Sequence, residues 1–179
     1  MITFDHVRLM AAYNSWQNRS IFAAASTLSD KDRKAERGAF FGSIHGTLNH
    51  ILWGDQMWMR RFTDTPPSGP KSIRESTTYF AEWEPLQDER FAFDQRIADW
   101  TATLDPRRLG ANLTWYSGAV GSEKTLPTWL LVTHFFNHQT HHRGQVHCML
   151  TQAGALPDDT DLPLLPMLTA EDMHRDGEL

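Results

Sequence analysis

The chain is poor in the features that mark several large classes of protein. It has a single cysteine, Cys148, among 179 residues, which excludes an internal disulfide framework. No apolar run approaches the roughly 20 residues that a helix needs to cross a bilayer. Lys and Arg (17) are outnumbered by Asp and Glu (22), and the net charge is −5. Because a basic excess is the usual mark of nucleic-acid binding, we expect neither nucleic acid nor membrane as a partner.

The N-terminus also lacks a targeting signal. The opening residues, MITFDH, become polar at once, without the basic start and apolar stretch of a secretory signal. We therefore expect a cytoplasmic protein. The content of 40% hydrophobic and 22% charged residues is ordinary for a globular protein. The length predicts one domain over residues 1–179, ending in an extended tail from about residue 155.

Helical patterning covers most of the chain. Apolar residues recur at spacings of three and four, as on one face of a helix. Pro127 suits a first helical turn and Gly154 suits the position just past a helix end, so they bracket the last helix. The four predicted helices cover residues 3–28, 42–62, 86–104 and 127–154.

The segments between these helices contain turn-forming and charged residues. We expect Pro85 to kink or restart the third helix, and residues 110–126 to form a short irregular hairpin. The other predicted features are a charged loop over 29–38, a proline-rich connection over 63–70, a turn or two of helix over 77–83, and a short turn over 170–174. This pattern predicts an all-α protein, an up-down four-helix bundle with a short hairpin before the last helix.

The last predicted helix contains five of the nine histidines. At about 100° per residue, His138 and His142 point into the apolar face of this helix. His134 precedes His138 by one turn but lies further from that face, and His147 lies opposite and should be solvated. Two inward imidazoles one turn apart form half of a metal site, although both could simply form hydrogen bonds inside the protein.

A third ligand has to come from another helix. The second predicted helix offers His45 and His50, which are five residues apart, so only one of them can face inward. His50 borders the apolar face and His45 lies behind it, and we choose His50. Three imidazoles, from His50, His138 and His142, leave a fourth position open for water, as in catalytic sites. Nitrogen ligands suit Zn, Ni, Fe or Cu.

Two other kinds of metal site fit less well. A zincin has His-Glu-x-x-His with the glutamate as general base, and Gln139 stands at that position here. A di-iron bundle needs two Glu-x-x-His motifs, and this chain has one, Glu171 to His174, in the tail. The sequence also shows no general base beyond metal-bound water, with His134 and His141 as weak candidates, so catalytic residues stay unassigned.

Polar residues near these histidines allow further readings. Arg143 could bind an anionic substrate group, but an ion pair on the helix surface is the simpler interpretation. Asn14 and Asn18 are one helical turn apart and could form hydrogen bonds across the bundle. Gln145 could orient a metal ligand.

Three motifs resemble the DinB-like, or damage-inducible, family of metal-binding four-helix bundles. They are AAYNSWQN in the first helix, GTLNHILWGD in the second and NHQTHHRGQ in the last, so the resemblance covers nearly the whole chain. It implies a divalent metal held by His50, His138 and His142, and a bundle that forms a homodimer. It also implies a relation to thiol-dependent transferases, and hence a low-molecular-weight thiol as a possible cofactor.

These observations lead to two hypotheses about function. The first is a metal-dependent enzyme, using Zn, Ni or Fe, that transfers a thiol to, or hydrolyses, a small electrophilic substrate. The second is a non-enzymatic metal-binding protein of a stress response, in which the metal stabilises the bundle.

Overall fold

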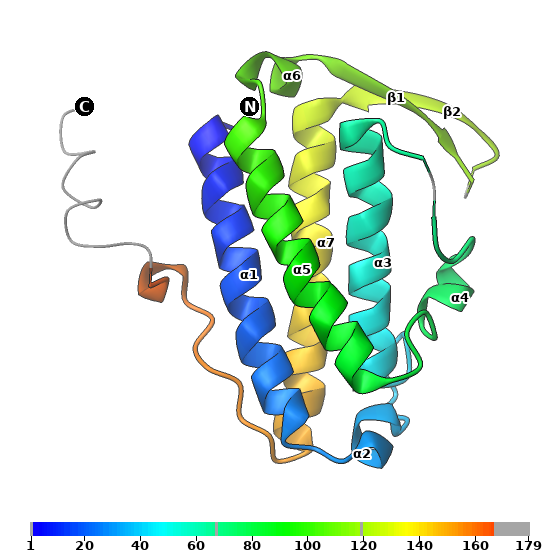
Figure 1. Cartoon of the computed structure of the whole chain (residues 1–179), viewed down its shortest axis with the longest axis vertical. Coiled ribbons are helices and arrows are strands. Elements are labelled where there is room, and N and C mark those ends of the chain that lie inside the picture. Colours follow the sequence, from blue (N-terminus) through cyan, green and yellow to red (C-terminus); the bar gives the residue numbers. More distant parts are fainter. Residues whose placement is uncertain (1, 67, 119, 167–179) are drawn as a thin grey trace.

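The structure, a computed structural model, describes residues 2–66, 68–118 and 120–166, and its main feature is a bundle of long helices (Figure 1). These helices are α1 (Phe4–Ser26), α3 (Ile44–Thr63), α5 (Trp83–Thr103) and α7 (Thr128–Gln152). α1 packs against α5 and α7, and α3 packs against the same two helices from the other side. The all-α four-helix bundle predicted from the sequence is confirmed.

The direction of α5 differs from simple up-and-down alternation. Phe22, near the end of α1, stacks on Trp83 at the start of α5, with ring centroids 5.1 Å apart. Phe62, near the end of α3, stacks on Trp100 near the end of α5 at 5.4 Å. α5 is therefore antiparallel to α1 but parallel to α3. The connection between α3 and α5 is long enough to run back along the bundle, which permits this order (Figure 1).

Short elements occupy the connections. The segment predicted as a charged loop contains a helix instead, because Ser29 Oγ caps it by accepting from the Asp32 backbone N–H at 3.1 Å. Pro85 does not kink α5, since it lies in the first turn, where its missing N–H costs nothing. The short helices are α2 (Asp30–Lys34), α4 (Ile73–Ser76), α6 (Pro106–Gly110) and the 3₁₀ turn η1 (Leu162–Leu164).

The predicted hairpin is present before the last helix. Strands β1 (Asn112–Ser117) and β2 (Ser122–Pro127) pair antiparallel, with Asn112 opposite Pro127 and Ser117 opposite Ser122. Trp115 packs edge-on against Trp58 of α3 at 5.7 Å, which attaches the hairpin to the bundle.

After α7, residues 155–161 form an extended strap along α1 (Figure 1). Gly154 has a φ of 80°, in the left-handed region that ends the helix as predicted. The Tyr13 hydroxyl donates to the Thr160 carbonyl at 2.8 Å and holds the strap in place. The turn predicted over 170–174 lies outside the described residues. No helix of the described chain is long and apolar enough to span a membrane.

Candidate metal centre

Three histidines from two neighbouring helices meet between α3 and α7. His50 is in the second turn of α3, and His138 and His142 lie one turn apart in the middle of α7. One ring nitrogen of each lies within 4.8 Å of the other two. The Nε2 atoms of His50 and His138 are 3.2 Å apart. Two nitrogens on one tetrahedral zinc ion would be separated by roughly 3.3 Å, so this pair matches a shared metal.

A glycine allows His138 to lie this close to α3. A Cβ atom at Gly54 would be 2.9 Å from His138 Cε1 and 3.4 Å from Nδ1. Gly54 is one turn after His50, so it faces α7 at the level of the site. Any larger residue at position 54 would displace the His138 ring.

In two of the three histidine rings, a hydrogen bond at Nδ1 determines which ring nitrogen is available to a metal. Ser76 Oγ donates to the Ile73 carbonyl at 2.6 Å and therefore accepts from His50 Nδ1, 2.9 Å away. In the same way the amide oxygen of Gln145 accepts from His142 Nδ1 at 2.8 Å. Both Nδ1 atoms then carry the proton, which leaves the Nε2 lone pairs free. Partners of this kind fix the orientation of metal-binding histidines, and the donor set here fits a divalent metal.

Burial keeps these imidazoles neutral. It lowers the pKa of His138 to about 3 and that of His50 to about 4, and the neighbouring histidines add to both effects. Burial also lowers the pKa of His142, against an opposing effect of Gln145. Since only the neutral form has a free lone pair, all three rings can accept a cation at neutral pH.

Aromatic side chains surround the three rings. Phe41, in the loop before α3, stacks on His50 with centroids 3.8 Å apart and lies 5.2 Å from His142. Trp53 lies 5.6 Å from His50. These contacts hold the His50 ring and make the surroundings of the nitrogens apolar.

The other histidines lie outside this group. The His134 ring packs edge-on against Trp58 at 5.2 Å and is not part of the cluster. His45 was expected behind the apolar face, but it is buried. Its Nε2 lies 2.8 Å from the Phe80 carbonyl, which supplies the hydrogen bond that a buried imidazole needs. His141 Nε2 lies 3.3 Å from the Gln145 amide nitrogen, next to the group but not in it.

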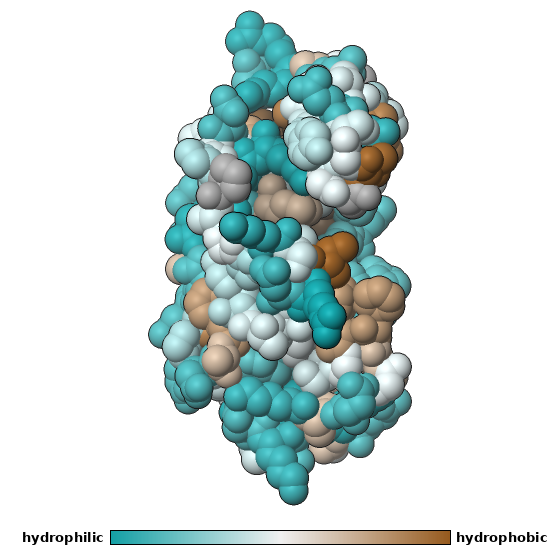
Figure 2. Space-filling model, turned by 90° about the vertical axis from the view of Figure 1, so that its right-hand side faces the viewer, coloured by the Kyte–Doolittle hydropathy of each residue, from teal (hydrophilic) through white to brown (hydrophobic). Residues whose placement is uncertain are grey.

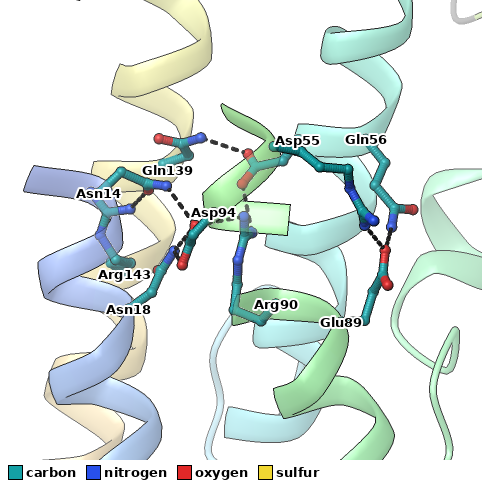
Figure 3. Close-up of polar contacts among 10 residues, drawn as sticks. Asn14, Asn18, Asp55, Gln56, Glu89, Arg90, Asp94, Gln139 and Arg143 are labelled. Carbon is teal, nitrogen blue, oxygen red and sulfur yellow. Dashed lines mark hydrogen bonds and ion pairs between the residues drawn. The ribbon is translucent and has the colours of Figure 1, made fainter. Parts of the chain in front are cut away.

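A buried polar network joins the long helices (Figure 3), and two of its members, Gln139 and Arg143, directly follow His138 and His142 in α7. Arg90 of α5 is central to it, with Asp55 Oδ2 at 2.6 Å and Asp94 Oδ1 at 2.8 Å. Asn14 and Asn18 donate to Asp94 at 2.9–3.1 Å, which confirms that these asparagines bond across the bundle. Nothing in the sequence indicated which acid they would meet, because Asp94 is 76 residues from Asn18.

The same network fixes the residues that follow the two histidines of α7. Gln139 Nε2 donates to Asp55 Oδ1 at 2.9 Å. Arg143 donates to Asn14 Oδ1 and is only 5% exposed, so the predicted surface ion pair is wrong. Gln139 and Arg143 lie one turn apart on the same face of α7, where Gln139 bonds to α3 and Arg143 bonds to α1, and together they fix the rotation of α7 about its axis.

Comparison with known proteins agrees with this architecture. The family model described as "DinB family" matches residues 1–174. The chain belongs to the DinB family. Protein DinB of Bacillus subtilis (strain 168) is 28% identical over 158 residues, covering 88% of this chain and 91% of that protein. The crystal structure of a DinB-like protein from Bacillus cereus ATCC 10987 shares the fold, with a TM-score of 0.60 and 16% identity. It covers 80% of this chain and 90% of its own.

Proposed function

We propose that this DinB family member is a divalent-metal-dependent enzyme that transfers a thiol to, or hydrolyses, a small electrophile. The observation that carries the proposal is the convergence of three neutral imidazoles, from His50, His138 and His142, within 4.8 Å. Among the described residues, the group contains only these three possible ligands. Three protein ligands leave a coordination position for a small molecule, whereas structural zinc sites have four.

The metal, when bound, would supply Lewis-acid activation of water, a thiol or a carbonyl. The protein's own contribution is to hold the three Nε2 atoms in place. Ser76 and Gln145 do this by accepting the Nδ1 protons of His50 and His142. Nitrogen ligands are compatible with Zn, Ni or Fe.

The residues around the site favour an apolar substrate. Phe40 and Ile73 are large exposed hydrophobic residues on segments that contact the histidines. Phe40 precedes Phe41, which stacks on His50, and Ile73 belongs to α4 together with Ser76. Figure 2 shows the side of the molecule that carries α3, α4 and the hairpin, where hydrophobic patches interrupt a mostly hydrophilic surface. Such patches would contact the apolar body of a small electrophile.

Elemental analysis of protein purified without a histidine tag tests the first half of the proposal. We expect about one equivalent of Zn, Ni or Fe in the wild type and its loss in His138→Ala. Absence of metal from the wild type after reconstitution would contradict the proposal.

Activity screens with the loaded protein test the second half. Low-molecular-weight thiols and water are offered as nucleophiles toward small electrophiles, and His50→Ala is the inactive control. Metal-dependent melting without turnover of any substrate would instead support a metal-binding stress-response protein, in which the metal serves stability.

A further inference from the structure

A glycine in the middle of α7 has no packing explanation. Gly144 lies eight residues before Gln152, the last residue of α7, and is therefore well inside the helix. Glycine costs about 1 kcal/mol relative to alanine at such a position. At Gly54 a close neighbour explains the missing side chain, but a Cβ at Gly144 would meet no atom within 4 Å. The absence of a side chain therefore leaves open space beside the helix.

That space is part of a pocket between α1, α7 and the strap. The pocket has a volume of about 350 Å³, within the range of small-molecule sites. Gln17 of α1 donates to the Asp159 carbonyl at 2.9 Å, and this bond fixes the strap as one wall. Arg143 and Gly144 of α7 form the opposite wall, and Cys148 lies one turn further along.

Arg143 brings a buried positive charge to this pocket. Its hydrogen-bond partners are both neutral, Asn14 Oδ1 and, at 3.5 Å, Thr140 Oγ1. In the described parts of the chain no carboxylate lies within ion-pairing distance of it, whereas Arg90 has two, at 2.6 and 2.8 Å. A guanidinium has five N–H donors and matches a carboxylate with two of them. Asp55 and Asp94 act on Arg143 only at longer range. Arg143 thus keeps N–H donors for an anion.

The remaining walls indicate the rest of the ligand. The Tyr13 ring lies 5.8 Å from Arg143 Cζ, and Ile21 adds an aliphatic surface. A ring or short apolar chain would pack against these two residues. The strap residues on either side of Thr160 are exposed aspartates, Asp159 and Asp161. A second negative charge on the ligand would be repelled by them.

We propose that this pocket binds a small organic monoanion. Its carboxylate contacts Arg143, and its apolar body lies against Tyr13 and Ile21 in the space left by Gly144. None of the three clustered histidines lines the pocket, so the proposal does not depend on metal binding.

Cys148 provides a way to detect occupancy. It is the single cysteine of the chain, it is exposed, and it lines the pocket. The rate of its alkylation by iodoacetamide, a neutral reagent, is measured on the full chain with and without benzoate as the probe. We expect benzoate to slow the reaction several-fold in a saturable manner. Phthalate, a dianion, and inorganic phosphate should protect much less.

Two substitutions at Gly144 make the test specific. Gly144→Leu fills the pocket, and we expect it to weaken benzoate binding, measured by calorimetry, at least about tenfold. Gly144→Ala is the matched control, since it makes the same helix-propensity gain with one methyl group and should retain protection. Each variant is compared with itself without benzoate, because the new side chain can change the reactivity of Cys148.

Three outcomes of the measurements on the wild type and on Gly144→Leu would overturn the proposal. They are no protection by benzoate, equal protection by phosphate, and benzoate binding that is unchanged in Gly144→Leu. A His138→Ala variant separates this pocket from the histidine cluster. Protection that persists in His138→Ala supports the pocket, and protection lost there would place benzoate at the histidines instead.

Discussion

At the scale of single residues, Gly54 has the most specific role beside the candidate metal centre. We expect Gly54→Ala to lower metal affinity about 10- to 100-fold, because the new Cβ would be 2.9 Å from His138 Cε1 and the ring must move. The stability of the metal-free protein should fall little, since alanine favours the helix by about 1 kcal/mol. Titration with Zn or Ni measures the first effect and urea unfolding the second.

Gly144→Ala is the control for this prediction. It also replaces a glycine in the interior of a long helix, but its Cβ would meet nothing within 4 Å. Metal affinity should therefore be unchanged in Gly144→Ala, and an equal loss in both variants would show that the effect comes from helix propensity.

The buried histidines should make the stability of the metal-free protein depend on pH. Burial lowers the pKa of His138 to about 3 and that of His50 to about 4, from 6.5. Below about pH 6.5 the unfolded chain therefore binds more protons than the folded chain. The contribution of these neutral histidines to the free energy of unfolding is complete above that pH and is lost as the pH falls toward 4. Asp55, with its pKa raised to about 6 by burial, has the opposite slope over part of this range.

Comparison with a histidine variant isolates the contribution of His138. We compare the free energies of unfolding of the wild type and of His138→Gln, and we expect the wild type to be favoured more at pH 7 than at pH 5. The reason is that the variant has no imidazole to protonate at position 138. Urea unfolding of both proteins in a chelator measures the difference. A difference independent of pH would show that the folded and unfolded states bind the His138 proton equally.

At the scale of elements, the polar network joins all four long helices through α5. Arg90→Met should lower the free energy of unfolding by about 3–5 kcal/mol, because it leaves the carboxylates of Asp55 and Asp94 buried without their cation. Arg96→Met, on the same helix, is the control. Its ion pair with Glu89 is 52% exposed on the arginine side, so we expect a loss below about 1 kcal/mol. Similar losses in the two variants would contradict the role of the network.

At the scale of the whole molecule, metal binding should couple α3 to α7. A ligand present at 100 times its dissociation constant stabilises the folded state by about 2.7 kcal/mol. For a chain of this size that amounts to a rise in Tm of roughly 5–10 °C. We expect this rise when Zn, Ni or Fe is added to chelator-treated protein, and no rise in His50→Ala. An equal rise in the variant would indicate that the metal binds elsewhere.

Much of the fold and part of the site followed from local sequence. The period of apolar residues located α1, α3 and α7 to within a few residues, because a helix repeats over short distances. The spacing of His138 and His142 placed both on one face, and the position of His50 at the border of the apolar face selected it over His45. Turn residues predicted the hairpin for the same local reason.

Contacts between distant segments were decided only by the tertiary structure. Sequence alone did not show that α5 runs parallel to α3, since a long connection can return to either end of a bundle. It did not pair Ser76 with His50, or bury Arg143 against Asn14, which lies 129 residues away. Periodicity states which face of a helix is buried, but which residue of another helix it meets depends on the packing of the whole core.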